Sequence, residues 1–112
     1  MAQMWKLLGT IRPTTTKAVM AIQAPRGMNW VIRQRIIVPV GVVQVKVSMF
    51  HDPRGRTYDE HTALLWKYQL GPGYMPFNES NDLISLEPET GSIGVQVDVP
   101  SAAVFHFYGW EL

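Results

Sequence analysis

The sequence lacks cysteine altogether, and it has few charges and no long apolar run. Without cysteine the chain cannot form disulfides, thiolate metal sites, iron–sulfur clusters or a cysteine nucleophile. The longest apolar stretches, such as residues 36–40, fall far short of the roughly 20 residues that a membrane helix needs. The first residues show no basic segment followed by an apolar stretch, so we expect cytoplasmic synthesis without a secretory signal.

The sequence also lacks a surplus of either positive or negative charge. Ten Lys and Arg residues stand against nine Asp and Glu residues, and all four types together make up 17% of the 112 residues. An average soluble domain has about 25% charged residues. A polybasic protein that binds nucleic acid or a membrane surface would need a surplus of positive charge. We therefore expect neither a membrane nor a nucleic acid as the partner, although cations stand beside aromatics at Trp5, Arg33 and Trp66.

The β-branched residues that favour strands are abundant, with twelve valines and seven isoleucines. Residues 43–49 and 93–99 alternate between apolar and polar side chains, the pattern of a half-buried strand. The inward side chains are predicted to be Val43, Val45, Val47, Val95, Val97 and Val99. The outward ones are predicted to be Gln44, Lys46, Gln96 and Asp98.

Further strands are predicted over residues 4–11, 17–23, 30–38, 83–87 and 102–110, with Gly9 at a bulge or bend of the first. In residues 30–38, Trp30, Ile32, Ile36 and Val38 should share one face, with Arg33 and Arg35 on the other. Proline and glycine mark the turns between the strands. About eight strands at this spacing predict one all-β domain over residues 1–112, an antiparallel β-sandwich of jelly-roll-like or immunoglobulin-like form.

Residues 58–70 fit two structures. Thr57 and Glu60 have the spacing of a helical capping box, whereas Leu64, Trp66, Tyr68 and Leu70 alternate as in a strand. We favour the strand, because the surrounding pattern is β. Residues 71–81 are interpreted as an ordered loop.

No residues with the spacing of a catalytic site are present. No serine lies in a GxSxG motif, and His51, His61 and His106 form no HxH, HxxxH or HExxH pattern. His51 and His61 flank a loop with acidic residues that suits a metal, but a solvated loop explains it better. We therefore predict a protein that is not an enzyme and has no metal and no cofactor.

Several predicted strands are apolar on both faces, and a two-layer fold cannot bury both. Exposed apolar patches usually contact a partner, so we predict a homo-oligomer, with a trimer favoured, within a larger protein assembly. The alternative is a monomer that covers these residues with its own termini and loop. The predicted contact residues are Val31, Ile37, Val42, Phe50, Val104 and Trp110, with Arg54 and Arg56 at the rim.

Aromatic residues offer a rival function, which is carbohydrate or small-ligand binding. The loop residues Tyr74, Phe77 and Asn78, together with Trp66, would supply stacking rings and a polar amide.

The overall pattern of short strands and low charge is similar to small β-sandwich subunits of viral particles, such as head-decoration proteins. This resemblance covers the whole chain without a specific motif. It implies a structural role in a symmetric oligomer, located in the virion, and identifies no residues.

Overall fold

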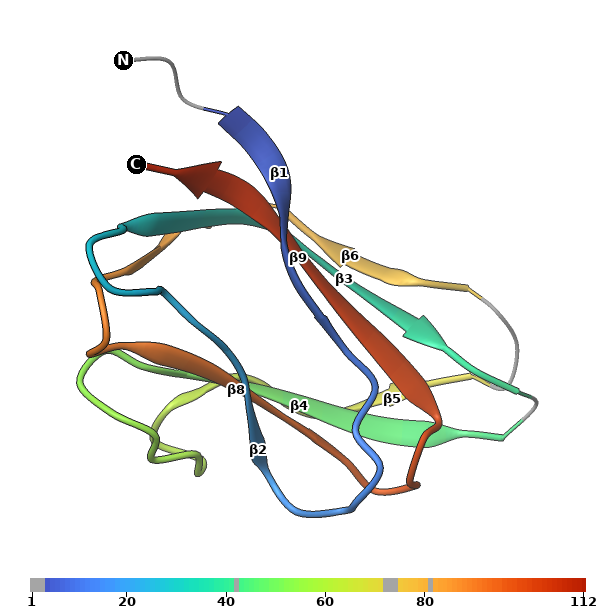
Figure 1. Ribbon diagram of the computed structural model, residues 1–112. Coiled ribbons are helices and arrows are strands. Elements are labelled where there is room, and N and C mark those ends of the chain that lie inside the picture. Colours follow the sequence, from blue (N-terminus) through green and yellow to red (C-terminus); the bar gives the residue numbers. More distant parts are fainter. Residues whose placement is uncertain (1–3, 42, 72–74, 81) are drawn as a thin grey trace.

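Two antiparallel β-sheets pack face to face in the computed structural model, which describes residues 4–41, 43–71, 75–80 and 82–112 (Figure 1). The predicted all-β antiparallel sandwich is confirmed. The described part of the chain contains nine strands: β1 (Met4–Ile11), β2 (Val19–Gln23), β3 (Trp30–Pro39), β4 (Val45–Asp52), β5 (Ala63–Leu70), β6 (Phe77–Glu79), β7 (Ile84–Leu86), β8 (Ser92–Val97) and β9 (Ala103–Glu111).

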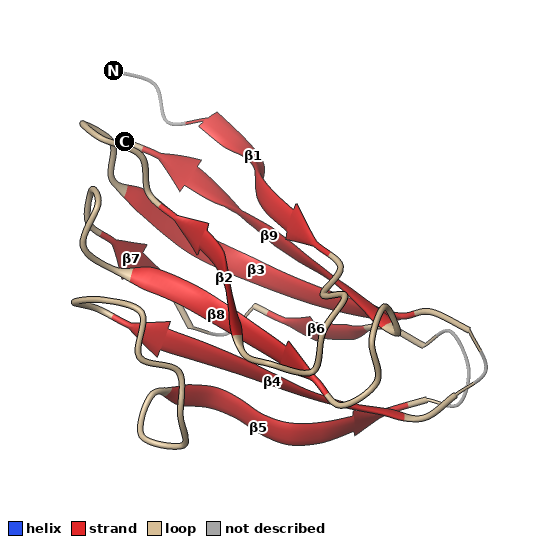
Figure 2. Cartoon of the chain, turned by 60° about the horizontal axis from the view of Figure 1, so that its bottom comes forward, coloured by secondary structure: helices blue, strands red, loops and turns tan. Residues whose placement is uncertain are grey.

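Sheet A has the strand order β1-β9-β3-β6, and β7 also pairs with β3 (Figure 2). Sheet B has the order β2-β8-β4-β5. The strand β9 lies between β1 and β3, and its residues Phe105 and Phe107 are fully buried between the sheets. The first and last strands lie side by side, because Met4 of β1 pairs with Glu111 of β9 (Figure 1).

The regular strands β4 and β8 follow the predicted alternation. Val45, Val47, Val95 and Val97 are buried as expected, while Lys46 and Asp98 are exposed and Gln96 is half-buried. The prediction is wrong for Val43, which is 48% exposed because β4 begins only at Val45. Three other predicted positions lie outside the strands: the half-buried Val99 and the exposed Gln44 and Asp98.

The predicted face of β3 is wrong beyond Ile32, because the pairing of β3 with β9 shifts by one residue between Ile32 and Gln34. An extra residue reverses which side chains point inward. Arg35 and Ile37 are therefore buried, and Ile36 and Val38 are half-buried on the outer side. The predicted bulge near Gly9 is confirmed by a similar shift between Leu7 and Gly9 in β1.

The ambiguous stretch is a strand, as favoured, from Ala63 to Leu70. The residues before it form a turn, in which Thr62 Oγ1 donates to the carbonyl of Thr57 and accepts from the backbone N–H of Asp59. Within the predicted loop, β6 was missed. Its three residues are too few to show a period, and they pair with β3 only in the folded chain.

The backbones of β9 and β3 approach each other closely at Gly109. A Cβ atom at this position would collide with the backbone carbonyl of Val31. We predict that Gly109→Ala lowers the free energy of unfolding by about 3 kcal/mol or more, since neither backbone can move without breaking sheet pairs. The measurement is urea denaturation followed by circular dichroism. Gly55→Ala is the control, because its Cβ would meet only Asp52 Oδ2, at 3.3 Å, and a loss as large as that of Gly109→Ala would contradict the explanation.

His51 lies on the inner side of β4, opposite the buried Ile93 of β8. Its Nε2 atom is buried and has no hydrogen-bond partner among the described residues. Burial lowers the pKa of His51 below its ordinary value of 6.5, and Asp52 acts in the opposite direction. The unfolded chain therefore binds this proton more readily than the folded chain.

It follows that the free energy of unfolding falls as the pH drops below about 6.5. We predict that His51→Leu removes this part of the pH dependence, while His61→Gln, which alters an exposed ring, keeps it. Denaturation curves between neutral pH and about pH 5 measure the effect. An unchanged slope in His51→Leu would assign the pH dependence to another group.

Candidate functional site

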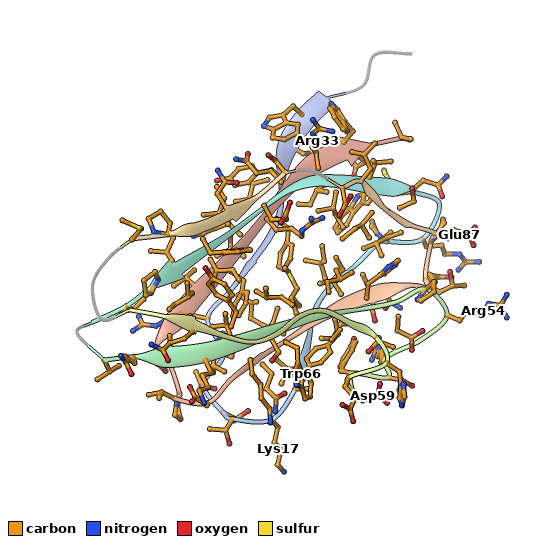
Figure 3. All side chains as sticks on the ribbon, turned by 180° about the vertical axis from the view of Figure 1, so that it is seen from behind. Lys17, Arg33, Arg54, Asp59, Trp66 and Glu87 are labelled. Carbon is orange, nitrogen blue, oxygen red and sulfur yellow. The ribbon has the colours of Figure 1, made fainter. Side chains whose placement is uncertain are left out.

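The outer face of sheet A is a broad surface with very little charge. Strand register and burial place uncharged side chains on it, and Figure 1 shows no described loop laid across this side. Arg33, at the shift in β3, is an exposed cation on the same side (Figure 3). We call this surface the sheet A face; it comprises Trp5, Leu7, Thr10, Val31, Gln34, Ile36, Val38, Asn78, Ser85, Val104, His106, Tyr108 and Trp110.

One end of the sheet A face is aromatic. Trp5 and Trp110 are paired residues of β1 and β9, and their ring centroids are 5.3 Å apart in an edge-to-face contact. Trp5 also stacks on Tyr108 at 6.2 Å. Trp5 and Leu7 nevertheless remain 46% and 48% exposed. Such rings bring a large apolar area with little side-chain freedom to lose, which suits a contact surface.

Four polar side chains of the sheet A face are paired with one another. Thr10 Oγ1 and His106 Nδ1 lie 3.1 Å apart, and Gln34 Nε2 donates to Asn78 Oδ1 at 3.2 Å. A polar group that is already paired can be covered at a lower cost than one that loses its water without replacement. This face can therefore be buried by a partner more easily than a charged surface.

Three predicted contact residues, Val31, Val104 and Trp110, lie on the sheet A face. The assignment of Ile37 and Phe50 to a contact surface is wrong. Ile37 points into the core because of the shift in β3, and Phe50 lies under Tyr58 and Trp66; both are 0% exposed. The predicted contact Val42 lies outside the described residues.

The two predicted rim arginines lie in the exposed loop between β4 and β5, where Arg54 lines a groove together with Ser85 of the sheet A face. Arg54 protrudes near Glu87 at one end of the sandwich (Figure 3). Arg56 donates to Gln23 Oε1 at 3.0 Å, which holds the loop against β2.

Sequence reasoning missed Trp5, Leu7 and Tyr108 as surface residues. Their signal was present, since residues 104, 106, 108 and 110 alternate on one face of β9 and Trp5 and Leu7 do so on β1.

The predicted ligand residues are divided among different surfaces. Trp66 points outward from sheet B, on the side opposite Arg33 (Figure 3). Phe77 packs on Tyr68, with ring centroids 5.0 Å apart, while Asn78 faces the outer side of sheet A. Phe77 and Asn78 do line one groove of about 260 Å³ together with Tyr68. Tyr74 lies outside the described residues.

The loop between β4 and β5 covers part of the outer face of sheet B. The ring of Tyr58 packs on Phe50 and lies directly over Gly94. A Cβ atom at Gly94 would come within 2.6 Å of this ring. Tyr58 Oη is 2.7 Å from Ser92 Oγ, and burial raises the pKa of Tyr58. Backbone N–H groups of Arg54 and Thr57 donate to Asp52, and these bonds lower the pKa of its carboxyl.

Within the described residues, no three His, Cys, Asp or Glu side chains lie close enough together to hold a metal ion. The part of the chain that is described contains no helix long and apolar enough to cross a membrane.

Comparisons of the chain with protein-family models, with curated proteins and with solved structures give no significant match.

Proposed function

We propose that this protein is a non-enzymatic structural subunit that associates with copies of itself through the sheet A face and belongs to a larger protein assembly. The observation that carries this proposal is the aromatic and half-exposed sheet A face, next to which Arg33 is an exposed cation on that side. Exposed apolar surfaces of this extent usually mark a protein contact. A location in a viral particle remains an expectation from the sequence resemblance alone.

The size of the sheet A face supports this proposal. At about 3.3 Å per residue, the nine residues of β9 span about 30 Å, and four strands at about 4.8 Å cover about 19 Å. The projected area is roughly 570 Å², and protruding side chains enlarge the accessible area. A standard specific interface buries about 800 Å² per partner, so the face is of suitable size.

The edges of the sheets are poorly suited to strand addition. The edge strands β1, β2 and β5 each contain a shift in register, and β6 and β7 have three residues each. Bulges and short edge strands are devices that prevent edge-to-edge pairing. Face-to-face packing is therefore the favoured contact. When two copies bind through the same face, that face is fully used and no further copy can add. We therefore propose a two-fold dimer in place of the trimer favoured from sequence.

A matched pair of leucines tests the contact. Leu7 on the sheet A face and Leu64 on sheet B are 48% and 46% exposed. We predict that the native chain has twice the 12.7 kDa monomer mass, and that Leu7→Glu weakens self-association at least about tenfold by burying an unpaired carboxylate. Leu64→Glu should leave the dimer intact. Multi-angle light scattering over a concentration series gives the masses.

Three outcomes would contradict the proposal. A native particle of 12.7 kDa at all concentrations would exclude self-association, and a mass of three subunits would restore the trimer. Equal dissociation of both leucine variants would place the contact away from the sheet A face.

Binding of a neutral carbohydrate is the second candidate function. The groove that contains Tyr68, Phe77 and Asn78 favours it. An aromatic pair beside an exposed amide suits a sugar ring and its hydroxyls. If this candidate is right, binding on a glycan array should fall at least about tenfold in Tyr68→Ala and persist in the equally exposed Trp66→Ala. Failure of the native protein to bind any neutral glycan would remove this candidate.

A further inference from the structure

A polar groove lies on the outer face of sheet B, on the opposite side of the molecule from the sheet A face. Its volume is about 460 Å³, within the roughly 300–1,000 Å³ of small-molecule sites. Polar side chains from three strands and the β1–β2 loop line it; its lining is Thr16, Lys46, Ser48, Lys67, Gln96, Val97 and Asp98. Neither the self-association contact nor the groove beside Tyr68 uses these residues.

A bulge in β5 brings Lys67 into this groove. The pairing of β4 with β5 shifts between Val47 and Met49, so that Trp66 and Lys67 together lie opposite Ser48. Lys67 has a positive φ of 49°, and its backbone N–H donates to Ser48 Oγ at 2.9 Å. A regular strand would place successive side chains on opposite faces. The bulge instead holds the ammonium of Lys67 5.1 Å from the centroid of the Trp66 ring.

Positive charge is concentrated around this groove. Lys46 and Lys67 line it, and the exposed Lys17 follows the lining residue Thr16 and lies on the same side as Trp66 (Figure 3). The fourth lysine of the chain, Lys6, forms an ion pair with Glu111 in sheet A. Three of the four lysines therefore surround one groove, where a single lining carboxylate, Asp98, opposes them.

The uncharged groups of the groove have hydrogen-bonding capacity for hydroxyls. Ser48 is only 3% exposed, and its Oγ accepts from Lys67, so its own O–H is available as a donor. Gln96 donates to the carbonyl of Thr16, which leaves its carbonyl oxygen as an acceptor. Asp98 Oδ1 accepts a hydrogen bond from the backbone N–H of Lys46, and Oδ2 serves as an acceptor for a ligand hydroxyl.

We infer that this groove binds an acidic saccharide. The carboxylate or sulfate of the sugar pairs with Lys46 and Lys67, and its hydroxyls bond to Ser48, Gln96 and Asp98. Trp66, which is 45% exposed, lies beside the groove and contacts the sugar ring. A carboxylate such as Asp98 accepts bonds from hydroxyls but offers no donor to an anion, so the lining favours a ligand that carries hydroxyls beside its anionic group, as an acidic sugar does, over an inorganic anion or a nucleic acid backbone.

The test is isothermal titration of the full chain with three probes: a galacturonate trimer, a heparin-derived tetrasaccharide and sialyllactose. We expect at least one to bind more tightly than about 1 mM. Lys46→Gln/Lys67→Gln should weaken that binding at least about tenfold, and Trp66→Ala by a smaller factor. Arg26→Gln/Arg54→Gln is the matched control, because it removes the same charge from exposed positions outside the groove.

The outcomes separate this site from the other proposals. Tyr68→Ala and Leu7→Glu should leave binding of the acidic probe unchanged, whatever their effects on neutral sugars and on mass. Equal weakening in the lysine and arginine double variants would mean non-specific charge attraction and overturn the inference. So would equal affinity for inorganic phosphate or single-stranded DNA, or no binding of any of the three probes.

Discussion

The positions of the extra residues in the strands determine which side chains enter the core. Register shifts occur in β1, β2, β3 and β5, and each exchanges the inner and outer faces of the rest of its strand. The shift in β3 buries the guanidinium of Arg35, which donates to the carbonyl of Asp82 and is 3% exposed. Burial lowers the pKa of Arg35, while Glu79 and Asp82 raise it. The same shift turns Ile36 and Val38 outward, where they extend the sheet A face.

The regular part of the fold was predictable from the sequence, whereas the irregular part was predicted only at Gly9. The valines of β4 and β8 alternate without interruption, so their burial follows from period two alone. A bulge without such a glycine signal depends on the partner strand, as in β3, whose backbone touches β9 at Gly109, and the sequence of β3 alone does not reveal it. The site followed the same division. The outward direction of Val31 and of the outer residues of β9 was predictable. Ile37 was wrongly predicted to face outward, because the pairing of β3 with β9 determines which of its side chains point inward.

The two outer faces differ because their strands differ in composition. Three of the even-numbered residues of β9, Val104, Tyr108 and Trp110, are apolar or aromatic, and they lie beside apolar residues of β1 and β3 with only Thr10, Gln34 and His106 as polar neighbours on these three strands. In sheet B, the outward positions of β4 and β8 alternate between lysine, serine, glutamine and aspartate, and only Phe50 interrupts this polar row. Tyr58 covers Phe50 and fills the space above Gly94, so that Phe50 is removed from solvent, whereas Trp66 of β5 remains 45% exposed on that side. The molecule thus has one apolar and one hydrophilic outer surface, which suits different kinds of contact.

The side-by-side first and last strands determine how the fold responds to mechanical force. Met4 and Glu111 are paired at the same end of adjacent antiparallel strands. Pulling on the two ends would load the hydrogen bonds between β1 and β9 one after another, rather than all together. The backbone hydrogen bonds between Leu112 and Asn29, the ion pair of Lys6 with Glu111, at 2.8 Å, and the bond from Trp30 Nε1 to Glu111, at 2.9 Å, are early contacts in the path of that force. The sandwich is therefore weakest when it is peeled from its termini, and a tether attached to both ends would open sheet A before sheet B.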